Sequence, residues 1–101
     1  MPTVEQMMEK YKDLMETSKS CYENGYDTLH DYIERIDAHY EYIRGYLNAI
    51  YVFGFMRGEE FDKLTDEIFK IRTTYQYIAF ERYKEESPYS EQSEESDNAH
   101  E

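Results

Sequence analysis

The sequence predicts an all-α protein, a three-helix antiparallel bundle in which the two long helices form a hairpin. Three observations lead to this prediction. Apolar residues recur at steps of three and four along three segments, residues that cap helices stand at the ends of those segments, and only four Gly and two Pro are present. We expect helices over about residues 3–20, 27–54 and 59–84, which together form one helical domain spanning 1–84.

The first expected helix begins after Thr3, whose side chain is a good N-cap. Gln6 follows three residues later and completes a capping-box pattern. Asn24 and Gly25 then provide a left-handed stop, which ends the helix. Between these ends, one face is lined by Val4, Met7, Met8, Tyr11, Leu14 and Met15.

The second expected helix begins near Thr28, with Asp31 as the acidic partner of its cap. Its apolar register steps regularly through Leu29, Ile33, Ile36, Tyr40, Ile43, Leu47 and Ile50. A second column beside it consists of Tyr32, His39, Tyr46 and Phe53. This apolar face is wider than a contact with one neighbour requires, so we expect the helix to be central. The same width favours a homodimer.

The turn after the second helix is expected at Gly54, with Phe55 folding back onto the last helical turn as in a Schellman motif. Glu59 and Glu60 suit the positive end of the next helix dipole. The third helix repeats the apolar spacing with Phe61, Leu64, Ile68, Ile71, Tyr75, Ile78 and Arg82. Residues 49–68 (AIYVFGFMRGEEFDKLTDEI) resemble the helical hairpin of short bacterial domains such as the SHOCT type, and hairpins in small proteins of phages and mobile elements.

The formal net charge is −12, and more than half of it lies at the C-terminal end. Residues 1–84 contain 16 acidic and 11 basic residues, whereas residues 85–101 contain seven acidic residues and no Lys or Arg. The segment 85–101 is also rich in Ser and has too few apolar residues to offset the entropy of ordering it. We therefore expect a disordered acidic tail over 85–101.

No motif for catalysis or for a cofactor is visible, so the sequence predicts a protein that is not an enzyme and uses no cofactor. It contains no phosphate loop, no cysteine pair and no HExxH metal motif. Cys21, the only cysteine, is interpreted as a small buried hydrophobe in a reducing compartment. His39 lies in an apolar column, which favours packing over catalysis. A metal-binding bundle is an alternative hypothesis, in which Asp27, His30 and Glu34 share a helix face and Glu59, Asp62 and Asp66 face them from the third helix.

Acidic residues gather on one side of the first two expected helices. The second helix presents Asp27, Asp31, Glu34, Asp37 and Glu41, and the first adds a parallel row that includes Glu9, Asp13 and Glu16. Carboxylates three or four residues apart on a helix lie about 5–6 Å apart, which approaches the spacing of phosphates along a nucleic-acid strand. Aromatic residues outside the strict apolar register could add contact area, and the candidates are Tyr22, Tyr26, Tyr77 and Phe80.

These patterns predict a small cytoplasmic protein that binds a protein partner with a basic surface. The more specific hypothesis is a phage- or mobile-element-encoded nucleic-acid mimic that blocks a nucleic-acid-binding host enzyme, as anti-CRISPR and anti-restriction inhibitors do. Direct nucleic-acid binding is disfavoured, because the Lys and Arg are scattered among twice as many acids. Membrane insertion is not expected, since no apolar run approaches the length of a bilayer span. A homodimeric adaptor without mimicry is the alternative.

Overall fold

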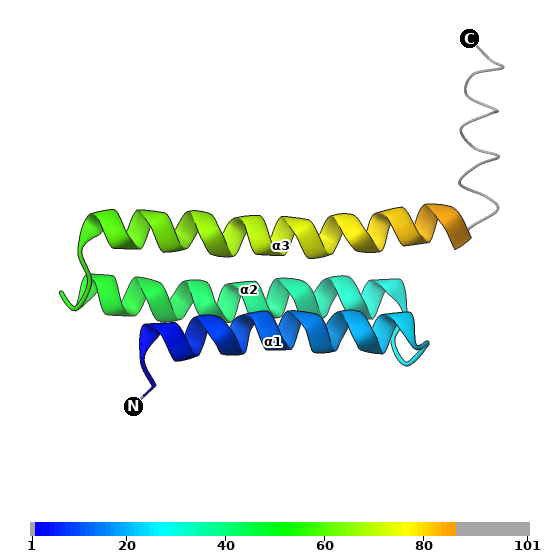
Figure 1. Ribbon diagram of the computed structural model, residues 1–101, viewed down its shortest axis with the longest axis horizontal. Helices are drawn as coiled ribbons and strands as arrows, with labels where there is room; N and C mark the ends of the chain where they lie inside the picture. The colour runs from blue at the N-terminus through cyan, green and yellow to red at the C-terminus, as the bar shows by residue number, and fades with distance from the viewer. Residues whose placement is uncertain (1, 87–101) are drawn as a thin grey trace, which may run out of the picture.

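The computed structural model describes residues 2–86, and within this range the chain forms three helices and no strand. α1 spans Val4–Glu23, α2 spans Leu29–Val52 and α3 spans Gly58–Glu86. The helices run side by side in alternating directions (Figure 1), which confirms the predicted antiparallel bundle. Glu85 and Glu86 belong to α3 rather than to the predicted tail, and residues 87–101 of that tail lie outside the described residues.

α1 begins and ends with the motifs that its sequence predicts. The backbone N–H of Gln6 donates to Oγ1 of Thr3 over 3.1 Å, and the N–H of Thr3 donates to Oε1 of Gln6 over 2.9 Å. Gly25 has a φ of +82°, and the N–H of Tyr26 donates back to the carbonyl of Cys21. These bonds satisfy backbone groups that the helix ends would otherwise leave unpaired.

α2 is held at both ends in the same way. The N–H of Asp31 donates to Oγ1 of Thr28 over 3.1 Å, which confirms Thr28 as the N-cap. At the other end Gly54 has a φ of +84°, and the N–H of Phe55 donates to the carbonyl of Ile50 over 2.9 Å. The backbone of the predicted Schellman motif is therefore present.

The core lies where α2 meets both of its neighbours, and α2 contributes the largest share of it. Its buried side chains are Tyr32, Ile36, Tyr40, Ile43 and Leu47. α1 supplies Met7, Met8, Tyr11 and Met15, and α3 supplies Ile68 and Ala79. The wide apolar face of α2 is thus covered within one chain, as its predicted central position requires. Homodimerisation is not needed to cover this face, and it stays a prediction.

α1 and α3 contact one another less than either contacts α2, and polar side chains bridge them at several points. The ammonium of Lys12 lies 3.7 Å from the carboxylate of Glu67, and the hydroxyl of Tyr75 donates a hydrogen bond to the carboxylate of Glu16. This seam is consequently the most open of the three. Among residues 2–86, no helix is both long enough and apolar enough to cross a membrane.

Candidate functional site

Two carboxylates of the predicted acidic row on α2 are neutralised within the fold. Asp27 has a side chain only 10% exposed, and its Oδ2 lies 2.9 Å from Nε of Arg35. Asp37 points toward α3, where it accepts a hydrogen bond of 2.8 Å from Gln76 and lies 3.8 Å from Arg72. Asp37 therefore links α2 to α3, whereas Asp27 is paired at the N-terminal end of α2, and both carboxylates have a cation beside them.

The three other acids of the α2 row are exposed, although each has a partner. Glu41 accepts a hydrogen bond of 2.7 Å from Arg44, which raises the pKa of that guanidinium. His30 Nδ1 lies 3.8 Å from the carboxylate of Asp31 and 3.6 Å from that of Glu34. Exposed pairs of this kind contribute little to stability, and the His30 contacts are ion pairs only when the imidazole is protonated, so a partner protein could replace them at small cost.

The carboxylates of α1 form the part of the acidic surface that has no cation beside it. Glu5, Glu9 and Asp13, here called the α1 acidic row, follow one another at steps of four on an exposed side of α1. Within the described part of the chain, no basic nitrogen lies within 4 Å of these three carboxylates. Glu16, also predicted for this surface, is instead bonded to Tyr75.

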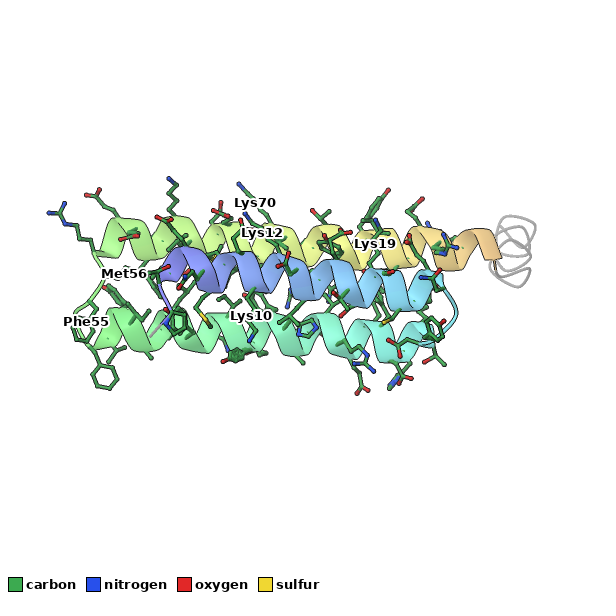
Figure 2. All side chains as sticks on the ribbon, turned by 60° about the horizontal axis from the view of Figure 1, so that its bottom comes forward. Lys10, Lys12, Lys19, Phe55, Met56 and Lys70 are labelled. Carbon is green, nitrogen blue, oxygen red and sulfur yellow. The ribbon has the colours of Figure 1, made fainter. Side chains whose placement is uncertain are left out.

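The lysines of α1 do not form ion pairs with this row. Figure 2 shows Lys12 and Lys19 on the α3 side of the helix and Lys10 on its α2 side. Lys12 is engaged by Glu67 across the α1–α3 seam. Lys10 borders the shallow hollow beside the row, but it comes within 4 Å of none of its carboxylates in the described residues. The α1 acidic row is therefore exposed and has no ion-pair partner within 4 Å among the described residues.

A groove of about 430 Å³ opens between α1 and α3 beside the α1 acidic row. Part of its wall is apolar and is made by Val4, Met8 and Leu64. Carboxylates line much of the remainder, together with Lys12, and these acids are Glu5, Glu9, Glu60 and Glu67. Lys and Arg side chains combine an apolar stem with a charged head, so a groove with both kinds of wall suits a basic side chain.

The predicted aromatic contacts gather at the opposite end of the bundle. Tyr26 lies in the α1–α2 turn, Tyr77 and Phe80 lie in the C-terminal part of α3, and all three are exposed. Tyr22 is different, because its ring stacks on the buried ring of Tyr32 with centroids 5.1 Å apart. The structure therefore argues against Tyr22 as a partner contact, and the other three stay predictions.

The most exposed apolar cluster lies in the α2–α3 turn, which the sequence did not single out as a site. Phe53 is 74% exposed, so its predicted place in the second apolar column of α2 is wrong. Phe55 is 83% exposed and does not fold back onto α2, because Met56, at 9% exposure, fills that position. Figure 2 shows Phe55 and Met56 at the end of the bundle where the two helices are joined. Val52 is exposed beside them.

A small cavity of about 240 Å³ lies between α1 and α2, with His39 in its wall. Nε2 of His39 lies 3.0 Å from Oγ of Ser18. Burial, together with the nearby charge of Arg35, lowers the pKa of His39. A hydroxyl–imidazole pair is the beginning of a nucleophilic site, but Ser18 is buried and no carboxylate hydrogen-bonds the ring in residues 2–86. The pair is therefore explained by packing.

His30, Asp31 and Glu34 are the described residues closest to a metal-binding arrangement. One potential ligand atom from each lies within 4.8 Å of the others, and all three side chains are exposed. They stand in the first turns of α2, where the positive end of the helix dipole opposes a cation. Asp27, the further ligand considered in the sequence, is engaged by Arg35. A metal site here stays a prediction without a buried ligand to support it.

Comparison with known proteins finds no matching family model, no matching curated protein and no matching solved structure.

Proposed function

We propose that this protein is a small acidic binding protein that occupies a basic surface on another protein. The observation that supports the proposal most directly is the α1 acidic row of Glu5, Glu9 and Asp13, which is exposed and has no cation within 4 Å in the described residues. The adjoining groove adds Glu60 and Glu67 from α3 to the same region, and Glu67 is paired there with Lys12.

The α1 acidic row is difficult to explain by stability. Like charges four residues apart on a helix destabilise it by about 0.2–0.5 kcal/mol per pair. Only Glu5 lies in the first turn of α1, where the helix dipole offsets its charge. Glu9 and Asp13 lie beyond that turn and have no ion-pair partner within 4 Å among the described residues. A basic partner surface would supply the missing opposite charge, and this gives the row a function in binding.

The chemistry of the row suggests the class of partner. Carboxylates about 5–6 Å apart along a rigid helix approach the arrangement of phosphates that basic channels hold in nucleic-acid-binding enzymes. The chain's net charge of −12 would also speed its approach to such a channel. We therefore infer a nucleic-acid mimic that inhibits an enzyme acting on DNA or RNA, of the anti-CRISPR or anti-restriction type, in a phage or mobile-element setting.

The proposal is tested by inhibition of DNA cleavage with two probes, an RNA-guided DNA nuclease and a restriction endonuclease, at low and high salt. Wild-type protein should inhibit at least one of them, and inhibition should weaken as salt rises because the contact is electrostatic. The double variant Glu9→Lys/Asp13→Lys should lose inhibition. A matched control, Glu34→Lys/Glu41→Lys, changes the net charge by the same amount on α2. This control should retain most of the inhibition.

The outcomes separate the two acidic rows. Loss of inhibition in both double variants would mean that the α2 row also contacts the enzyme, as the sequence alone suggests. Full inhibition by the α1 double variant would contradict the α1 row as the binding surface. Absence of inhibition of both nucleases by the wild-type protein, or inhibition that does not change with salt, would count against the mimic itself.

A further inference from the structure

The α2–α3 turn exposes apolar side chains that the fold does not use. Val52, Phe53 and Phe55 are each at least 74% exposed, while the neighbouring Met56 closes the end of the core. In a Schellman turn the residue after the glycine commonly packs on the helix, but here Phe55 faces solvent at the end of the bundle (Figure 2). Contiguous exposed apolar residues on a small soluble domain mark an interaction site.

The backbone that carries these side chains is fixed. The N–H groups of Gly54 and Phe55 donate to the carbonyls of Tyr51 and Ile50 over 3.0 and 2.9 Å. The ring of Tyr51 stacks on that of Phe61 in α3, with centroids 4.4 Å apart and planes inclined by 16°. Hydrogen bonds to α2 and the ring stack on α3 thus hold the turn in place. Aromatic residues on a fixed backbone lose little entropy on binding, which favours their use as hot spots.

The turn also lies at the end of the bundle where α1 and α3 begin. Figure 1 shows that the N-terminus of α1 and the α2–α3 turn are at the same end of the bundle, opposite the α1–α2 turn. Glu5 in the first turn of α1 and Glu59 and Glu60 in the first turn of α3 therefore lie toward the end that carries the turn, and Arg57 lies in the turn itself. A surface complementary to this end combines an apolar pocket with Lys or Arg around it.

We propose that Phe53 and Phe55 insert into an apolar pocket of a protein partner, and that basic residues at the rim of this pocket meet the carboxylates of α1 and α3. The class of partner rests on the proposed function, whereas the role of the turn does not. Burial of the two rings supplies affinity that salt does not screen, and the carboxylates supply steering and orientation.

Charge complementarity favours a protein pocket with a basic rim over an anionic membrane or a second copy of the chain. An anionic membrane would repel Glu5, Glu59 and Glu60, which outnumber Arg57 at this end of the bundle. A second copy of the chain, docked turn to turn, would bring the same acidic groups against one another. A protein pocket with a basic rim satisfies both the apolar and the acidic parts of this end.

The test uses a displayed library of random peptides as the probe, selected on the full-length wild-type chain. We expect enrichment of peptides that combine large apolar residues with Lys or Arg. The double variant Phe53→Ser/Phe55→Ser should bind them at least about tenfold more weakly, since burying even one Phe ring is worth about that factor. The control Tyr42→Ser removes an exposed aromatic ring from α2, away from the turn, and should bind like the wild type.

The result separates this inference from the proposed function. In one outcome the enriched peptides lack basic residues, bind Glu9→Lys/Asp13→Lys as they bind the wild type, and fail to bind Phe53→Ser/Phe55→Ser. This result would support the turn as a binding site and refute the acidic partner surface. If only Glu9→Lys/Asp13→Lys lost peptide binding, the result would support the acidic surface and overturn the role of the turn. Failure to enrich any peptide would also overturn it. The inference would also be overturned if the wild-type chain floated with phosphatidylcholine–phosphatidylglycerol vesicles, or dimerised in sedimentation, and Phe53→Ser/Phe55→Ser abolished that behaviour.

Discussion

The hydroxyl of Tyr11 donates a hydrogen bond of 2.8 Å to the backbone carbonyl of Ile68 and so joins the middle of α1 to the middle of α3. Both side chains are buried. Burial raises the pKa of the Tyr11 phenol, which therefore remains a neutral donor throughout the physiological range. Tyr32 makes the equivalent bond from α2 to α3, donating to the carbonyl of Tyr75 over 3.0 Å. Two buried tyrosines thus fix the position of α3.

Replacing either hydroxyl should lower stability without changing the fold. Tyr11→Phe and Tyr32→Phe each keep the ring in the core and remove one hydrogen bond, at a cost of about 0.5–1.5 kcal/mol. Urea unfolding followed by circular dichroism measures the difference. Tyr77→Phe, whose hydroxyl is on an exposed side chain, should leave the unfolding free energy unchanged. Equal stability of all three variants would show that these bonds do not hold α3 in place.

Met56 and Phe55 should respond in opposite ways to truncation, although they are adjacent in sequence. Met56→Ala empties a buried position at the end of the core and should cost about 2 kcal/mol or more. Phe55→Ala removes an exposed ring and should change stability by less than about 0.5 kcal/mol. Thermal unfolding compares the two variants directly. A larger loss for Phe55→Ala would mean that its ring packs on α2 as the Schellman pattern first suggested.

The fold could be predicted from the sequence because its determinants are local. The Thr3 and Thr28 caps, the two glycine stops and the apolar spacing each act within a few residues. Which side chains at the end of α2 are buried could not be predicted from local sequence. Phe53, Phe55 and Met56 are all apolar, and only the path of the turn decides which of them reaches the core.

The candidate site was less predictable because charge pairing depends on tertiary contacts. Asp37 belongs to the α2 row by sequence, but Gln76 and Arg72 of α3 engage it. Lys12 stands beside Asp13 in sequence, yet it pairs with Glu67 across the seam. Spacing alone identified the carboxylates of α1 and α2. It could not show which of them form ion pairs in the described residues, as Asp27, Asp37 and Glu41 do.

His39 should make the stability of the protein depend on pH. Its pKa is lowered in the folded state from the usual 6.5, first by burial and then by the charge of Arg35. The unfolded chain therefore binds the proton more readily, and the stability present above pH 6.5 is lost as pH falls through the folded pKa. His39→Gln cannot titrate, so urea unfolding should show the wild type losing stability relative to this variant below pH 6.5. Parallel pH profiles would contradict the assignment.

Neutralising the α1 acidic row should stabilise the protein while weakening its binding. Glu9 has a carboxylate four residues away on either side, so Glu9→Gln removes two repulsions worth about 0.2–0.5 kcal/mol each. The gain in unfolding free energy should be measurable at low salt and should shrink at high salt, because salt screens exposed charges. Glu41→Gln is the control, since it removes a carboxylate that hydrogen-bonds Arg44, and it should bring no gain. If Glu9→Gln raises the free energy of unfolding and weakens nuclease inhibition, the wild-type Glu9 serves binding at the expense of stability. A loss of stability instead would mean that Glu9 has a favourable contact within the fold, and the binding role of the row would lose its main physical argument.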